Sequence, residues 1–216
     1  MKPHYQFALL VIGAFVLSNI PIVHWPFSWL ETYFHEISHG LAAVLSGGSI
    51  ERIVLHFNGS GLCYTRGGWQ PLVTFAGYAG AVAWGAIIYL SAKASGTNNR
   101  WPAIIMLGML LVSGILYARD LITILIMLII SGTLYISFRH VVGGIFPRFM
   151  EFAGVYVMVS AAQAPLDLID GRHYGDGATL ANVTWLPEII WALLWCSIAV
   201  GTLLLLWNQS RQYQPK

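Results

Sequence analysis

Charged residues are scarce in this chain, and their scarcity excludes a soluble globular protein. Lysine, arginine, aspartate and glutamate make up 9% of the 216 residues, whereas hydrophobic residues make up 57%. A soluble domain normally has about a quarter of its residues charged, because polar groups must cover its surface. The sequence therefore predicts an integral membrane protein, with the lipid bilayer as its main surroundings.

Two further absences narrow the possible functions. The eleven basic and nine acidic residues are scattered along the chain. No block of basic residues indicates nucleic-acid binding, so we expect no nucleic-acid partner. The two cysteines, Cys63 and Cys196, lie far apart and neither belongs to a CxxC pair. This spacing indicates neither a disulfide framework nor a cysteine zinc site.

Long apolar runs are abundant. A helix needs roughly 17 to 25 apolar residues to cross about 30 Å of hydrocarbon. Runs of that kind cover residues 5–23, 29–46, 71–92, 101–117, 121–138, 149–166 and 185–207, and only three residues separate the fourth from the fifth. The sequence therefore predicts an all-α, multi-pass bundle of six or seven transmembrane helices, forming one domain over residues 1–216.

The second apolar run carries an H-E-x-x-H motif, formed by His35, Glu36 and His39. On a helix the two histidines are at positions i and i+4, so they project from one face and can bind one zinc ion, with Glu36 beside them as general base. The alternative is that the histidines form hydrogen bonds between helices, with Glu36 as their partner. A carboxylate within the bilayer is costly without a function, which favours the metal interpretation.

The flanks of this run predict where the motif helix begins and ends. Ser28, followed three residues later by Glu31, has the spacing of a capping box, and Gly47-Gly48 is a typical helix stop. We therefore expect the helix to begin near Ser28. The two histidines would then lie well below the membrane surface rather than in a loop.

The segment after the motif helix predicts a short β-hairpin. Residues 50–57 and 62–66 are rich in strand-forming residues and flank the Asn58-Gly59 turn. A hairpin edge next to a metal site can pair with an extended peptide and present the carbonyl groups of that peptide to the metal. The alternative is an ordinary connecting hairpin packed on the bundle.

A catalytic zinc ion usually has three protein ligands, so the two histidines need a third partner from elsewhere in the chain. The one dense polar cluster, residues 165–177, contains Asp167, Asp170 and Asp176. Asp176 is also a candidate helix N-cap, and Asp170 a candidate turn residue. The residues themselves leave both aspartates open as ligands.

These motifs resemble the intramembrane zinc metalloproteases of the site-2 protease type. That family places H-E-x-x-H in a transmembrane helix, follows it with a β-hairpin region, and takes its third zinc ligand from an L-D-G motif. Ile169-Asp170-Gly171 after Pro165 looks like a degenerate version, with alanine at position 162 and Asp167 in place of the family's asparagine and second proline. This resemblance implies Asp170 as the third ligand.

A closer resemblance is to the compact bacterial branch of M50-like metallopeptidases. Its A-G-Y-x-G run is similar to residues 76–80, its late S-D-A-x-x-L-A-x-x-T-x-x-P pattern to residues 175–187, and its W-x-x-L-W pattern to residues 191–195. This resemblance implies Asp176 as the third ligand and Zn²⁺ as the cofactor. It also implies a membrane protein or peptide as substrate and a location in the bacterial inner membrane.

Two other classes of function remain as alternatives. One is a metal or proton transporter, which usually repeats its polar positions on several helices; here they are confined to one helix and one loop. The other is a catalytically inactive membrane chaperone or binding protein, which has no need for the base Glu36. The sequence therefore favours an endopeptidase.

Overall fold

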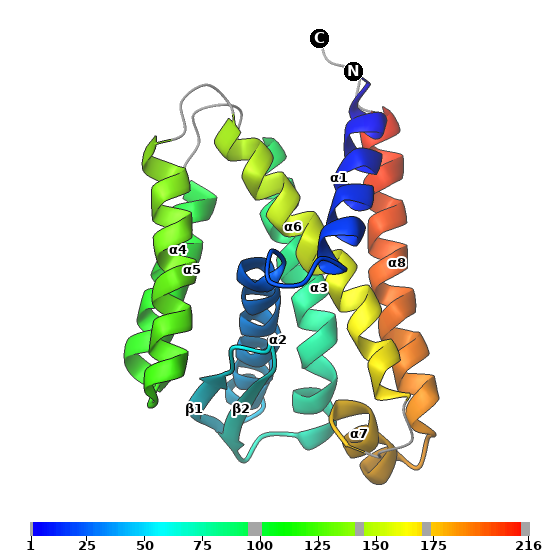
Figure 1. Ribbon diagram of the computed structural model, residues 1–216. Helices are drawn as coiled ribbons and strands as arrows, with labels where there is room; N and C mark the ends of the chain where they lie inside the picture. Colours follow the sequence, from blue (N-terminus) through cyan, green and yellow to red (C-terminus); the bar gives the residue numbers. More distant parts are fainter. Residues whose placement is uncertain (1, 95–100, 141–144, 170–173, 213–216) are drawn as a thin grey trace.

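The computed structural model describes residues 2–94, 101–140, 145–169 and 174–212, and these residues are mainly helical. Its elements, shown in Figure 1, are α1 (Pro3–Ser18), α2 (Trp25–Leu45), β1 (Ser49–Leu55), β2 (Gly61–Arg66), α3 (Gln70–Ala94), α4 (Trp101–Tyr117), α5 (Leu121–His140), α6 (Ile145–Gln163), the short 3₁₀ helix η2 (Ala164–Leu168), α7 (Asp176–Thr184) and α8 (Glu188–Gln212). The predicted helical bundle with a hairpin after the motif helix is confirmed.

The start of α1 and the end of α8 lie at one end of the bundle, and the hairpin and α7 lie at the other (Figure 1). Helices α1 and α2 follow each other in the same direction along the bundle, joined by a turn in which Ile22 has a φ of 69°. As a result, α2 and its motif occupy the half of the bundle that contains the hairpin and α7.

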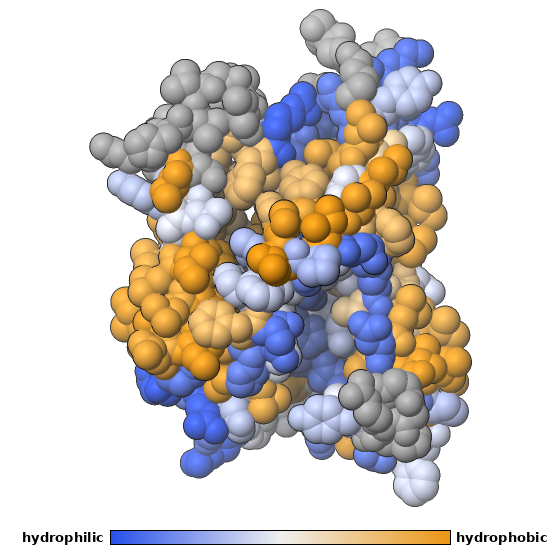
Figure 2. Space-filling model, viewed as in Figure 1, coloured by the Kyte–Doolittle hydropathy of each residue, from blue (hydrophilic) through white to orange (hydrophobic). Residues whose placement is uncertain are grey.

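Three helical segments in the described part of the chain are long and apolar enough to cross a membrane: Gln70–Ala94, Phe146–Leu168 and Glu188–Gln212. Three further apolar helices are shorter there: Pro3–Ser18, Ala103–Tyr117 and Leu121–Ile136. Figure 2 shows hydrophobic residues over α4 and α5 on one flank and over α8 on the other. The chain is a membrane protein, and the count of six or seven crossings stays a prediction.

The expected capping box at the start of α2 is wrong. The helix begins at Trp25, with His24 as its N-cap, and the backbone N–H of Ser28 donates to the His24 carbonyl at 2.9 Å. Ser28 is therefore already inside the first turn. This start agrees with Pro26, because the fixed φ of proline and its missing N–H favour a place in the first turn of a helix.

Helices α3 and α6 form the closely packed centre of the bundle. A Cβ atom on Gly85 of α3 would lie 2.7 Å from the carbonyl oxygen of Gly154 in α6, and one on Gly154 would lie 2.6 Å from the Gly85 oxygen. The two backbones therefore touch, which is the usual way in which small residues join helices in a membrane. Helix α2 packs on α3.

The hairpin is antiparallel, with Ile53 paired to Cys63 and Leu55 paired to Gly61. Its turn is held against α2 by two side chains: Trp29 Nε1 donates to the Phe57 carbonyl at 3.2 Å, and Thr32 Oγ1 donates to the Gly59 carbonyl at 2.6 Å. The hairpin is therefore fastened to the helix that carries the motif.

The outer edge of β1 is covered by the junction of α4 and α5. Ile53 forms a parallel bridge with Ala118, and the backbone N–H of Leu55 donates to Thr123 Oγ1 at 2.8 Å. Within the described residues, β2 pairs with β1 alone. The other side of β2 faces α2, where the Cys63 N–H donates to Glu36 and Gly61 lies against Thr32 and Glu36.

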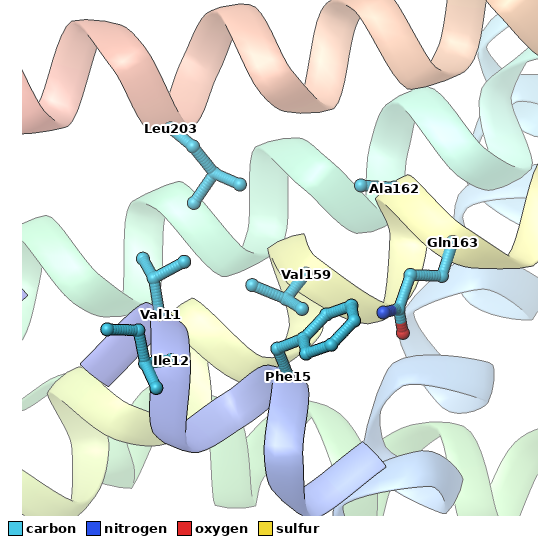
Figure 3. A pocket seen from close by; sticks show the side chains of 7 residues that line it. All are labelled: Val11, Ile12, Phe15, Val159, Ala162, Gln163 and Leu203. Carbon is cyan, nitrogen blue, oxygen red and sulfur yellow. The ribbon is translucent and has the colours of Figure 1, made fainter. Parts of the chain in front are cut away.

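A groove between α1, α6 and α8 is almost entirely apolar. Figure 3 shows its lining: Val11, Ile12, Phe15, Val159, Ala162, Gln163 and Leu203. Its single polar side chain, Gln163, accepts a hydrogen bond from Ser18 Oγ at 3.1 Å. Because the groove offers no acid, base or metal ligand, the chemistry belongs elsewhere.

The contact between α3 and α6 predicts that Gly85→Ala destabilises the protein. The added methyl group meets a backbone oxygen, and overpacking of this kind costs about 1–3 kcal/mol. The control is Gly201→Ala in α8, where nothing lies within 4 Å of the added carbon. Thermal unfolding in detergent should show a lower Tm for Gly85→Ala and an equal or higher Tm for the control. Equal melting temperatures for Gly85→Ala and the wild type would contradict the close contact.

Candidate metal centre

Three side chains predicted as metal ligands converge at one point. His35 Nε2 and His39 Nε2 are 2.9 Å apart, and Asp176 Oδ2 lies 3.1 Å from the first and 3.3 Å from the second. The two histidines come from successive turns of α2, and Asp176 comes from the start of α7. These are the residues of the described chain that can hold a metal ion together.

The size of this triangle fits a tetrahedral zinc site. Zinc lies about 2.0–2.1 Å from histidine nitrogens and at a similar distance from carboxylate oxygens, which places neighbouring ligand atoms about 3.4 Å apart. The three observed separations, from 2.9 to 3.3 Å, are close to that value. Three protein ligands also leave one coordination position for water.

The second ring nitrogen of His39 is also engaged. His39 Nδ1 lies 2.7 Å from the Val73 carbonyl at the beginning of α3. Since a carbonyl only accepts hydrogen bonds, this contact assigns the proton of the neutral ring to Nδ1 and leaves the Nε2 lone pair for a metal.

Helix α3 forms a wall of small residues against the two imidazoles. A Cβ atom on Gly77 would lie 2.5 Å from His39 Cε1 and 2.6 Å from His35 Cε1. Next to Gly77, the ring of Tyr78 meets the His35 ring edge to face, with centroids 4.4 Å apart. Residues 76–80 are thus a close-packing face, as their small-residue pattern indicates, and they shape the site directly.

Asp176 is not the N-cap of α7. The N-cap is Gly175, with a φ of 95°, and no side chain caps this helix end. Burial raises the pKa of Asp176, but the charges and hydrogen bonds of His39 and His35 outweigh burial and hold that pKa below its usual range. The N-cap interpretation of Asp176 is therefore wrong, and its carboxylate is directed to the histidines.

The other polar residues of the late cluster do not join the site as described. Asp167 lies in η2 and is exposed. Asp170, the alternative third ligand, lies outside the described residues, as does His173. The assignment of Asp170 therefore stays a prediction.

Glu36 is buried beside the ligands, with 4% of its surface exposed. Its carboxylate accepts a hydrogen bond from the backbone N–H of Cys63 in β2, and within the described residues its Oε2 has no hydrogen-bond partner. The fit against the strand is close, because a Cβ atom on Gly61 would lie 2.9 Å from Glu36 Oε1. A buried carboxylate with an unengaged oxygen is well suited to accept a proton.

Buried acidic side chains gather around the histidines. Glu31, Glu36 and Asp176 interact electrostatically with one another or with His35. The arginine ion pairs found among the described residues join Arg66 to Glu51 and Arg148 to Glu151, so neither includes these three carboxylates. Because ionising a buried carboxyl group without a cation is costly, a divalent metal ion would suit this cluster of acidic side chains.

Two residues close to the site, Glu31 and Gly77, were not predicted from the sequence to belong to it. Glu31 was assigned to a capping box that does not form, although its position four residues before His35 in a helical run places it on the same face. Gly77 belongs to the A-G-Y-x-G run, which in the sequence indicates only the family resemblance and close helix packing. Its contact with the rings depends on the register of α3 against α2, for which the sequence contains no signal.

A helical membrane bundle with this group of side chains has the components that a membrane metallopeptidase requires. The model of the Peptidase M50B-like family matches residues 7–206, and the chain belongs to that family. The resemblance to site-2 protease-type peptidases is thereby confirmed, and with it a peptide or protein as substrate. The comparisons with curated proteins and with solved structures gave no match.

The contact of Gly77 with both imidazoles predicts that Gly77→Ala weakens metal binding. The added methyl group must displace the His35 and His39 rings by several tenths of an ångström or more, so the three ligand atoms no longer converge. Metal analysis of the purified protein should show most of the bound divalent metal lost. Gly201→Ala is the control, and retention of full metal by Gly77→Ala would contradict the described contact.

Proposed function

We propose that this protein is a zinc-dependent intramembrane endopeptidase, a multi-pass protein of the bacterial inner membrane. The observation that supports this best is the convergence of His35, His39 and Asp176, with Glu36 buried beside them. The donor set matches zinc, and membership of the M50B-like family supports peptide-bond hydrolysis.

The proposed chemistry divides between the metal and Glu36. Bound zinc supplies Lewis acidity, which lowers the pKa of water towards about 7 and polarises a carbonyl group. Glu36 removes a proton from the water as its oxygen bonds to the peptide carbonyl carbon. The C–N bond then breaks, and Glu36 passes the proton to the leaving amine.

The edge of β2 is the proposed place for the substrate backbone. The β1 edge is covered at Ile53 and Leu55, whereas β2 carries Cys63, whose backbone N–H reaches the Glu36 carboxylate. An extended peptide that pairs with β2 would run past the general base and bring its carbonyl groups to the ligands. Intramembrane substrates would have to unwind locally to do so.

Access for water is proposed from the end of the bundle that contains the hairpin and α7. Figure 2 shows hydrophilic residues down the middle of this face, between the hydrophobic flanks. The exposed residue Asp167 belongs to η2, which lies between α6 and α7 in the chain. Water can therefore approach without crossing the apolar flanks.

The transporter and inactive-chaperone alternatives find less support. The group of residues able to hold a metal ion in the described chain is a single cluster, whereas transport requires a succession of sites across the membrane. A binding protein without catalysis has no use for a buried acidic side chain such as Glu36, because burying that group costs free energy.

The identity of the third ligand is tested by replacing Asp176 and Asp170, each in turn, with alanine. Wild-type protein should contain about one zinc ion per chain, as three convergent protein ligands imply. Asp176→Ala and His39→Ala should each lose most of the zinc, because two remaining ligands bind it weakly. Asp170→Ala should retain zinc. Elemental analysis of the purified proteins gives the answer.

If Asp170→Ala loses the zinc while Asp176→Ala keeps it, the third ligand is Asp170, as the L-D-G resemblance implies. Full zinc in His39→Ala would refute the metal centre.

The role of Glu36 is tested by Glu36→Gln, which preserves size and polarity but removes the basic carboxylate. This variant should keep its zinc and lose at least 100-fold in cleavage rate, within the usual range for a missing general base. The measurement is mass spectrometry of products from a library of single-span transmembrane peptides in detergent. Cleavage by Glu36→Gln at the wild-type rate would refute the mechanism, and zinc without cleavage in the wild type would favour a binding protein.

A further inference from the structure

Glu31 is a buried acidic residue that the proposed mechanism does not use. It lies in α2 with 7% of its surface exposed, one helical turn before His35. Its carboxylate interacts electrostatically with His35 and accepts a hydrogen bond from the hydroxyl group of Ser160 in α6. Because burying a carboxyl group costs free energy, the burial of Glu31 needs a structural or functional explanation.

Helix geometry brings Glu31 next to the His35 ring. Residues at i and i+4 share one face, and side chains on a helix lean towards its N-terminus. The imidazole of His35 therefore leans over the turn that contains Glu31. Direct ligation by Glu31 is not indicated, because the convergent group in the described chain consists of His35, His39 and Asp176.

The two histidines differ in how their second ring nitrogen is held. Nδ1 of His39 contacts the Val73 carbonyl, whereas the hydrogen bonds found for His35 in the described chain involve Nε2. Histidines that bind metals almost always give their other N–H to a carboxylate, a carbonyl or a water molecule. Glu31 is the buried carboxylate on the same helix face that can serve His35 in this way.

Structural explanations account less well for Glu31. A capping role is excluded, because α2 begins at Trp25 and Glu31 lies beyond the first turn. A tie to Ser160 alone would be satisfied by a neutral amide, without the cost of burying a carboxylate. The other group with which the Glu31 carboxyl group interacts favourably is His35, so the histidine offers the better explanation.

We propose that Glu31 is a positioning residue for the metal ligand His35. Its carboxylate holds the orientation of that imidazole and makes the ring a stronger donor to a divalent cation. The proposal rests on the metal centre proposed above. It predicts a specific loss of metal affinity, of about 10- to 100-fold, when the carboxylate is replaced.

The experiment compares zinc affinity among matched variants. Protein stripped with a chelator is titrated with Zn²⁺ in competition with a coloured chelator, which gives the Kd. Glu31→Gln keeps the size of the side chain and its hydrogen bond with Ser160, and its Kd should rise 10- to 100-fold. Ser160→Ala removes the tie to α6 but keeps the carboxylate, and its Kd should stay within about threefold of the wild type.

The control for losing a buried carboxylate is Glu151→Gln. Glu151 in α6 is 9% exposed and pairs with Arg148 at 2.9 Å. Its replacement should lower the Tm without changing the zinc Kd. Glu31→Asp, which keeps the charge, should recover part of the affinity lost in Glu31→Gln.

Three outcomes would overturn the proposal. A wild-type Kd in folded Glu31→Gln would refute a role for Glu31 while leaving the metal centre intact. An equal loss in Ser160→Ala would show that Glu31 acts as a tie between helices and not through its charge. Absence of zinc binding by the wild-type protein would refute the metal centre and this inference with it.

Discussion

The close approach of α3 to α2 is the contact on which the site depends. Gly77 lies against both imidazoles, and Gly80 lies against Ser38 one turn further along α3, so neither position has room for a side chain. Helix α3 is fixed in turn by its backbone contact with α6 at Gly85 and Gly154. The position of the histidine rings thus depends on close contacts across three helices. The contact between Gly85 and Gly154 is backbone against backbone, so no change of side-chain rotamer can relieve it.

The parts of the fold specified by local patterns could be predicted from the sequence. The hairpin has its own turn at Asn58-Gly59, and the motif helix has the 3.6-residue period of its histidines, so both were predicted. The start of α2 was missed because two local signals competed, and Pro26 prevailed over the capping pattern at Ser28. The number of membrane crossings stays a prediction, since length and composition identify only three long apolar segments among the described residues.

The candidate site could be predicted only in part, for a different physical reason. His35, Glu36 and His39 belong to one local motif, whereas Asp176 reaches them through the tertiary fold. In the sequence both Asp176 and Asp170 resemble turn or cap residues, because short polar side chains next to glycine serve either purpose. The structure brings Asp176 to the histidines, and its role as a metal ligand stays a prediction. The contribution of Glu31 depends on its burial between α2 and α6, and a short sequence motif cannot predict such burial.

The fastening of the hairpin to α2 has a consequence for how cleavage sites would be chosen. Trp29 and Thr32 hold the hairpin turn, and Glu36 on the same helix contacts β2, so strand and base form a single rigid part. If a peptide paired with that strand, the pairing would fix the position of each of its residues relative to Glu36. Under the proposed function, the distance of a peptide bond along the paired segment would then select the cleavage site, and the ease with which a segment unwinds from its helix would select the substrate.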